Sequence, residues 1–349
     1  MAVEDYNWAD KLVHKLAFGT KVPQDVLCDI EAQLYADQIS RQKAMAPIFI
    51  TSLPRAGTTV LLEVLARHPA LVAHSYRDMP FVLSPIIWRR VSSRFHVAQD
   101  AAERSHGDGL MINVDSPEAF EEVLWLREFG DHYTKTGIAT WDRLPPEFVK
   151  TFREHMKALI ASRGVEHGGR YLSKNNANIA RYGALARALP DAKFLLPLRH
   201  PLDQAVSLMK QHKRALAEHD ATPFARAYTR DVGHFEFGRN HRPILFDSFA
   251  TDGLDPEHVD YWLAYWIAGH RQFESDMRAV VLDMGALTNG ATPVETVFDR
   301  LGLAPSAEAL AHASGLLRPL PERRDDAGAD EDLLKTATEL FETIRARAI

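Results

Sequence analysis

The sequence predicts an α/β protein of three layers, in which a central parallel sheet lies between helices. Short apolar runs typical of buried strands, such as 48–50 and 192–198, alternate along the chain with longer segments of amphipathic helix pattern. The first of these runs leads directly into a polar loop and a strong helix pattern, over residues 47–69. Alternation at this spacing is typical of βαβ units, whose parallel strands are buried on both faces.

The elements follow in order along one domain, 1–349, which we favour over two domains. Residues 1–45 form a helical N-terminal extension, because their apolar positions recur at helical spacing on both sides of a break at Gly19 and Pro23. The α/β core spans 47–305 and carries helical insertions. Ser116 as N-cap and Pro117 at the first helical position predict a helix over 116–127 within it. The further predicted strands are 71–73, 170–173 and 279–282, and the further predicted helices are 57–67, 145–164, 202–216, 260–277, 294–303 and, after the core, 333–347.

Composition limits the class of protein. The 349 residues are 46% hydrophobic and 25% charged, as in ordinary soluble proteins, and the net charge of −6 argues against a nucleic-acid partner. The single cysteine, Cys28, excludes intramolecular disulfides and fits a reducing compartment. We see no signal-peptide pattern and no apolar run near the ~18–20 residues that span a bilayer, so we expect a cytoplasmic protein without a transmembrane segment. No metal-binding motif appears, and the oligomeric state stays open.

The loop 52–59, SLPRAGTT, has the features of an anion-binding loop. A strand that feeds a loop and then a helix leaves backbone N–H groups and the positive end of the helix dipole around one small space. Arg55 adds a cation there, and Thr58 and Thr59 add hydroxyl groups. A Walker A loop, G-x-x-x-x-G-K-[ST], would have glycine at Ser52 and lysine at Thr58. This P-loop-like loop lacks both the glycine and the lysine, so we do not expect ordinary ATP or GTP chemistry.

The stretch Pro54-Arg55-Ala56-Gly57-Thr58-Thr59 resembles the 5′-phosphosulfate loop of sulfotransferases that use 3′-phosphoadenylyl sulfate (PAPS). A second match follows the strand 192–198, where Arg199 is followed eight positions later by Ser207. In that family an arginine and a serine so placed hold the 3′-phosphate, which arginine can grip with two hydrogen bonds. The resemblance covers about 47–210 and is closer to the glycan and bacterial types than to the cytosolic phenol type. It implies that the cofactor-binding residues are Arg55, Ala56, Gly57, Thr58, Thr59, Arg199 and Ser207.

The same resemblance implies two catalytic residues. Lys174 follows a predicted strand and is similar to the lysine that contacts the transferring group, although Asn175-Asn176 replaces the family's usual Ser/Thr-Pro. Asp78 is similar to the acidic residue that acts as base, and burial would have to raise its pKa from about 4. His74 and His106 are alternative bases.

Three further features have no single interpretation. Glu121-Glu122 either borders the acceptor pocket or belongs to a solvated helix face, and His234–Gly238 is a candidate lid over substrate or nucleotide. Many cytosolic relatives have a basic Arg-Lys-Gly run near the C-terminus, for which Arg323-Arg324 is a weak substitute.

The resemblance implies that the protein moves a sulfonate from PAPS to a hydroxyl or amine of a small-molecule, lipid or carbohydrate acceptor, without a metal. The product would be adenosine 3′,5′-bisphosphate. One alternative is a degenerate P-loop kinase or NTPase, which would need Mg²⁺. Asp283, at the end of a predicted strand, is the candidate ligand for that ion. The other is a non-catalytic nucleotide-binding protein. The acceptor pocket is expected from 79–145 and 215–260, and its ligand is not specified by the sequence.

Overall fold

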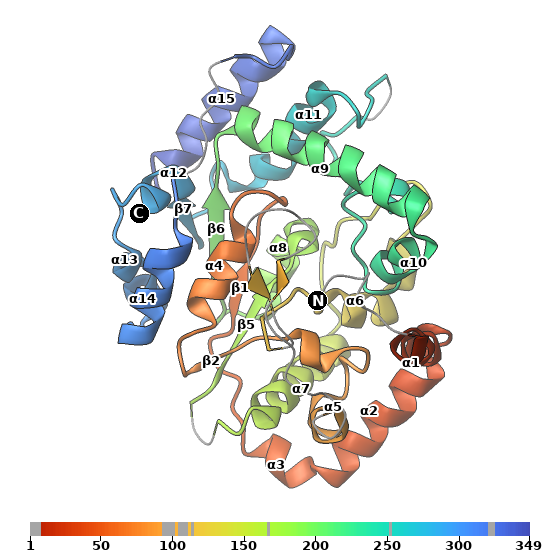
Figure 1. The fold of residues 1–349 in the computed structure, drawn as a ribbon. Coiled ribbons are helices and arrows are strands. Elements are labelled where there is room, and N and C mark those ends of the chain that lie inside the picture. Colours follow the sequence, from red (N-terminus) through yellow and green to blue (C-terminus); the bar gives the residue numbers. More distant parts are fainter. Residues whose placement is uncertain are drawn as a thin grey trace.

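The computed structural model describes residues 8–92, 102–103, 111–112, 115–165, 168–250, 253–319 and 325–349 (Figure 1). Within these residues, five strands form one sheet in which every neighbouring pair is parallel. The predicted parallel sheet is therefore confirmed. The strand order is β2 (Leu71–Val72), β5 (Arg170–Lys174), β1 (Ile48–Ile50), β6 (Lys193–Leu198) and β7 (Ala279–Asp283). The short strands β3 (Ala102–Glu103) and β4 (Met111–Ile112) pair with each other in antiparallel fashion.

Helices cover both faces of this sheet. This arrangement is required because the side chains of β1 point alternately to the two faces and all of them are apolar and buried. Phe49 points to one side, where its ring stacks on Phe194 with 5.4 Å between centroids and lies 6.1 Å from Phe152 of α7 (Pro146–Ser162). Ile48 and Ile50 point to the other side, into a second apolar cluster with residues of α4 (Thr58–Leu65). Two buried faces require two helical layers, so the predicted three-layer architecture is confirmed.

The helices on the Phe49 side contribute to the larger apolar cluster and include α6, α7, α8, α9, α11 and α15, whereas α4, α12, α13 and α14 contribute to the cluster around Ile48 and Ile50. The bounds are α1 (Trp8–Phe18), α2 (Val22–Leu34), α3 (Ala36–Ser40), α4 (Thr58–Leu65), α5 (Pro85–Ser92), α6 (Glu122–Glu128), α7 (Pro146–Ser162), α8 (Tyr182–Ala188), α9 (Pro201–Ala221), α10 (Pro223–Asp231), α11 (Val259–His270), α12 (Met284–Thr288), α13 (Val294–Leu301), α14 (Ala307–Leu316) and α15 (Glu331–Arg345). No helix of the described ranges has both the length and the apolar character that crossing a bilayer requires.

The strand order brings three loops to one edge of the sheet. β1 lies between β5 and β6, with Ile50 in register with Lys174 on one side and with Leu195 on the other. The loop after β1, the end of β5 and the turn after β6 therefore meet at the carboxyl edge, where open α/β sheets bind their ligands. Figure 1 shows α9 (green) crossing beyond the end toward which β6 points.

The predicted helix over 116–127 is wrong in its first half. The structure has an α-helix only from Glu122 to Glu128, and Pro117 forms an antiparallel bridge with Ser75. The N–H of Glu118 donates to the carbonyl oxygen of His74 at 2.9 Å. These contacts with a segment about forty residues earlier override the local capping pattern, since tertiary pairing outweighs helix propensity. Helix α14 lies where no helix was predicted, and α9 continues five residues beyond its predicted end.

Candidate functional site

The loop after β1 is held in a fixed shape from behind. Gly57 has a φ of 90°, and a Cβ at this position would lie 2.6 Å from Cε of Met284. The left-handed backbone therefore favours glycine there, and any larger residue would also have to displace the flexible end of Met284. The amide nitrogen of Gln204 donates to the carbonyl oxygens of Leu53 and Pro54, at 3.1 and 2.8 Å, and Gln204 itself accepts from the indole N–H of Trp266. A loop fixed by buried hydrogen bonds is organised before any ligand arrives.

Two motifs that are far apart in sequence meet at Arg55. Its Nε donates to Oγ of Ser207 at 3.1 Å, although the two residues are 152 positions apart. Nη1 of Arg199 donates to the carbonyl oxygen of Arg55 at 3.0 Å. Arg55 has a φ of 68°, which is uncommon for a residue with a side chain. This backbone turn is what sends the carbonyl to Arg199 while the side chain reaches Ser207.

The polar atoms around this junction fit an anionic ligand. Burial lowers the pKa of Arg199 below the usual arginine value, and the positive charge of Arg55 lowers it further against the opposing effect of Asp203. Within the described residues, the buried Nε of Arg199 and Oγ of Ser52 have no hydrogen-bond partner. Two arginines that meet at one junction, with unpaired buried donors beside them, suit the phosphate groups of a nucleotide better than a neutral ligand.

Lys174, at the end of β5, and Asn176, just after it, lie in the same space as the loop. They line a cavity of about 150 Å³ together with Arg55, Thr58 and Thr59. Nδ2 of Asn176 donates to Oε1 of Glu236 at 3.0 Å, and Oγ1 of Thr58 lies 3.5 Å from Oδ1 of Asn176. The other residues on the cavity wall are Pro54, Tyr76, Glu118, Phe120, Gln211, Ala215, Glu218, His219, Tyr228, Thr229, His234, Glu236 and Phe237. The wall of the cavity thus combines the cations Arg55 and Lys174 and the hydroxyl groups of Thr58 and Thr59 with aromatic and acidic side chains.

The acidic side chains of this wall were not identified as site residues from the sequence. The segment His234–Gly238 is a candidate lid on its sequence, but the residues around Glu236 indicate no role for this side chain. Glu118 was placed in a helix, which the structure corrects. Both oxygens of Glu118 already accept hydrogen bonds, from Oη of Tyr76 at 2.5 Å and from the N–H of Ala119 at 2.8 Å. Glu236, by contrast, is held through Oε1 by Asn176 and is only partly buried.

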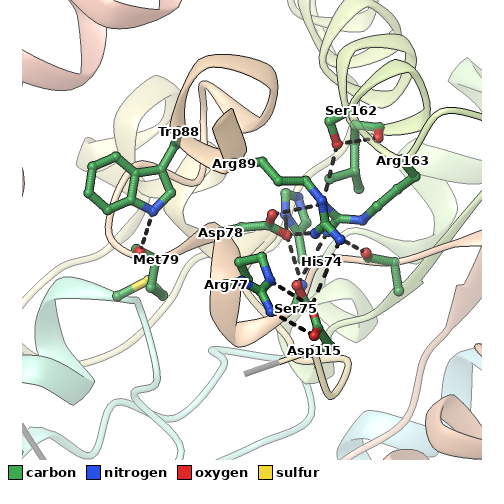
Figure 2. A network of polar contacts seen from close by, with 12 residues as sticks. His74, Ser75, Arg77, Asp78, Met79, Trp88, Arg89, Asp115, Ser162 and Arg163 are labelled. Atoms are coloured by element: carbon green, nitrogen blue, oxygen red, sulfur yellow. Dashed lines mark hydrogen bonds and ion pairs between the residues drawn. The ribbon is translucent and has the colours of Figure 1, made fainter. Parts of the chain in front are cut away.

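The geometry argues against Asp78 as the base. Figure 2 shows its carboxylate against the guanidinium of Arg163, while Arg77 beside it pairs with Asp115. The two hydrogen bonds from Arg163 to Asp78 measure 2.5 and 3.0 Å. Asp78 is fully buried and is not among the residues that line the cavity around Lys174. Burial raises its pKa, but the ion pair with Arg163 and hydrogen bonds from His74 and Arg163 outweigh burial, so the pKa lies well below its usual range. A carboxylate so paired binds a proton poorly.

His74, one of the two alternative bases, fits no better than Asp78. His74 is buried beside Asp78, with its Nε2 3.0 Å from Nε2 of His155, and it lines a different cavity with Arg89 and Arg163. His106 lies outside the described residues, as do Arg323-Arg324.

Glu121 and Glu122 are buried, so the interpretation of a solvated helix face is wrong. Glu122 forms a buried ion pair with Arg181, and Glu121 accepts from the hydroxyl of Tyr171 at 2.8 Å. Asp283, the candidate Mg²⁺ ligand of the kinase alternative, caps α12 by accepting from the N–H groups of Gly285 and Ala286. Across the described part of the chain, no three His, Cys, Asp or Glu side chains are grouped so as to hold a metal ion.

Comparison with known proteins places the chain in a family. A model of the "Sulfotransferase family" matches residues 47–243, and no curated protein matches the sequence. Among solved structures, the sulfotransferase STF1 from Mycobacterium tuberculosis is similar at 15% identity and a TM-score of 0.49, covering 89% of this chain and 81% of that one. STF9 from Mycobacterium avium is similar at 15% identity and a TM-score of 0.48, with 90% and 79% covered. A sulfotransferase from Alicyclobacillus acidocaldarius gives 16% identity and a TM-score of 0.38, with 87% and 96% covered. Because the family model matches more than half of the sequence, the chain belongs to the sulfotransferase family.

Proposed function

We propose that the protein transfers a sulfonate group from PAPS to a hydroxyl or amine of a small-molecule, lipid or carbohydrate acceptor, and releases adenosine 3′,5′-bisphosphate. The observation that carries the proposal is the junction of the two motifs at Arg55, where Ser207 and Arg199 both contact the loop residue. PAPS has phosphate groups at both ends of its ribose, and a site for it needs two neighbouring anion-binding elements. Membership of the sulfotransferase family supports the same donor.

The residues of the site divide into two groups by position. The backbone N–H groups of residues 56–59, at the N-terminus of α4, would hold the 5′-phosphosulfate with the side chains of Arg55, Thr58 and Thr59. Arg199 and Ser207 would hold the 3′-phosphate. Bound PAPS supplies an activated sulfonate on a phosphate leaving group. The ammonium of Lys174, which lines the same cavity, would neutralise the charge that develops on the leaving oxygen.

We assign the role of base to Glu236 rather than to Asp78. Glu236 lines the cavity with Lys174, and Asn176 fixes its position through Oε1. Glu236 would accept the proton of the acceptor hydroxyl as the acceptor oxygen forms its bond to sulfur and the bond between sulfur and the phosphate oxygen breaks. Because Glu236 is only partly buried, water can reach the site at which the proton would be taken up.

The test is sulfonate transfer from ³⁵S-labelled PAPS to a fractionated small-molecule extract, with products identified by their gain of one sulfonate in mass spectrometry. We expect a labelled product with the wild-type protein, and a loss of about 10²–10⁴-fold in rate with Glu236→Gln. Binding of adenosine 3′,5′-bisphosphate should be nearly unchanged in that variant, because glutamine keeps the size of the side chain and none of the nucleotide contacts proposed above involves Glu236. Glu257→Gln, which alters an exposed glutamate outside the cavity, is the matched control.

A thermal-shift titration separates the alternatives. Stabilisation by adenosine 3′,5′-bisphosphate without Mg²⁺ supports the proposal, whereas stabilisation only by Mg-ATP would support the kinase alternative. If the bisphosphate binds and no extract yields a labelled product, the protein is a nucleotide-binding protein without transferase activity. Full activity of Glu236→Gln would overturn the assignment of the base alone.

A further inference from the structure

The residue between Lys174 and Asn176 faces away from the cavity. Lys174 ends β5, Asn176 begins a short 3₁₀-helix (Asn176–Ala180), and both side chains line the cavity. Asn175 has an extended backbone, with a φ of −145° and a ψ of 114°, and is not among the residues that line the cavity. Successive side chains of an extended chain point to opposite sides. Asn175 therefore points into the protein, where its side chain is buried.

Asn175 is held there through both polar atoms of its amide. Its Nδ2 donates to Oε2 of Glu122 at 2.7 Å, and its Oδ1 accepts from the N–H of Ala177 at 3.0 Å. The second contact caps the 3₁₀-helix, and the first joins the turn to α6, 53 positions away in sequence. The stretch 174–181 contains no proline that would fix its backbone. Hydrogen bonds therefore determine the conformation of this turn.

Glu122, which holds Asn175, is itself fixed by buried partners. Nη2 of Arg181 donates to Oε2 of Glu122, and the hydroxyl of Tyr133 donates to Oε1. The guanidinium carbon of Arg181 lies 3.8 Å from the centre of the Trp125 ring, which adds a favourable contact between a cation and an aromatic face. Both charged side chains are buried. Neither can leave alone, because the other would remain as a buried charge without its partner.

The far end of the same turn is attached to the same network. Nε of Arg181 donates to Oδ1 of Asn178 at 2.7 Å, and Nδ2 of Asn178 donates to Oε1 of Glu121 at 3.0 Å. Among Glu121, Glu122, Asn175, Asn178 and Arg181, no buried side-chain nitrogen or oxygen lacks a hydrogen-bond partner. A buried ion pair often adds little stability compared with an apolar pair of the same size. What a fully satisfied network provides is one defined conformation, here that of the turn after β5.

We propose that Asn175 is a positioning residue for sulfonate transfer and that Glu122 holds it in place. The inference rests on the function proposed above, in which Lys174 and Glu236 act on the reacting groups. Lys174 directly precedes Asn175, and Asn176, which directly follows it, fixes Glu236 through Oε1. A shift of the turn moves both groups relative to the nucleotide, whose proposed ligands lie on the loop after β1, the turn after β6 and α9. A misplacement of about 1 Å in such a geometry can cost about 100-fold in rate.

The kinetics of Asn175→Ser test this inference, with ³⁵S-labelled PAPS and the extract fraction that wild type labels. The serine hydroxyl can still accept from the N–H of Ala177 but is too short to reach Glu122. We expect kcat to fall by about 10–100-fold, while affinity for adenosine 3′,5′-bisphosphate changes less than about twofold. Amide hydrogen exchange over 174–181 should become faster, because the turn loses one attachment. Asn175→Asp, which keeps the size of the side chain and the cap but not the donated hydrogen bond, should behave in the same way.

The matched control is Tyr133→Phe, which removes a different hydrogen bond to the same carboxylate and leaves the contact with Asn175 in place. Its stability in urea denaturation should fall by a similar amount, while kcat and hydrogen exchange over 174–181 stay at the wild-type values. An active wild type with unchanged kcat in both Asn175 variants would overturn the inference and leave the proposed function standing. So would an equal loss of kcat in Tyr133→Phe, or a loss of folding in both Asn175 variants, since the role of the network would then be structural. If wild type labels no acceptor, the proposed function fails, and the role of Asn175 in transfer fails with it.

Discussion

Replacing Asp78 by asparagine distinguishes a structural role from a catalytic one. The substitution keeps the shape of the side chain and removes its charge. Arg163, whose side chain is only 14% exposed, then has no carboxylate partner at this position. Removing one partner of a buried ion pair costs about 3–5 kcal/mol of unfolding free energy. We expect a loss of this size for Asp78→Asn in urea denaturation at neutral pH. Asp115→Asn breaks the Arg77 pair, in which Asp115 is 53% exposed, and should cost only about 0–1 kcal/mol.

The pH dependence of this difference follows from the direction of the pKa shift. Because the pKa of Asp78 is lower in the folded protein than its ordinary value of 3.8, the unfolded state binds the proton first as the pH falls. The stabilisation is therefore complete above about pH 4 and is lost progressively at lower pH. Wild type and Asp78→Asn should converge in stability under acid conditions.

Catalysis supplies the result that would refute this reasoning. Folded Asp78→Asn should retain its turnover and its affinity for adenosine 3′,5′-bisphosphate, because Asp78 does not line the cavity. A variant with wild-type stability and a turnover lowered by about 100-fold or more would show that Asp78 is the base after all.

Three other substitutions test separate parts of the account. Gly57→Ala should lower the free energy of unfolding by about 1–2 kcal/mol, because alanine is strained in the left-handed backbone conformation. It should also weaken binding of adenosine 3′,5′-bisphosphate in calorimetry. Adding Met284→Ala should restore part of this binding, because it removes the atom that lies 2.6 Å from the new Cβ. Lys174→Met should lower the rate of transfer by about 10²–10³-fold in the ³⁵S assay while affinity for the bisphosphate, which lacks the sulfonate, changes little. Burial and the neighbouring His74 lower the pKa of His155 from 6.5 to about 3 in the folded protein. As the pH falls, the unfolded state therefore binds a proton on this residue before the folded state does. The free energy of unfolding should fall as the pH drops below about 6.5. His155→Gln should flatten that slope in urea denaturation, and an unchanged slope would contradict the assignment.

The sheet could be predicted from the sequence because its strands are short apolar runs bounded by loops. Once the runs 48–50, 170–173 and 192–198 are recognised as parallel strands, the residues that follow them must gather at one edge. The meeting of Arg55 with Ser207 and Arg199 is a consequence of that order. The position of Lys174 in the same cavity follows for the same reason.

The features that sequence reasoning missed depend on contacts between distant residues. The ion-pair partner of Asp78, Arg163, is 85 positions away, and nothing in the sequence near Asp78 indicates this contact. Glu236 is 60 positions from Asn176, and nothing in its local pattern indicates that it faces the cavity. Ser116 and Pro117 have the residue types that favour the start of a helix, but the bridge between Pro117 and Ser75 determines the backbone conformation there.

The most direct test of the central claim is calorimetric binding of two nucleotides that differ only in the 3′-phosphate. We compare adenosine 3′,5′-bisphosphate with adenosine 5′-monophosphate, using wild type and Arg199→Ala. We expect wild type to prefer the bisphosphate by at least about tenfold, and Arg199→Ala to lose most of this preference while it binds the monophosphate as wild type does. Equal affinities in wild type, or a preference that survives in Arg199→Ala, would contradict a PAPS site built from Arg55, Arg199 and Ser207.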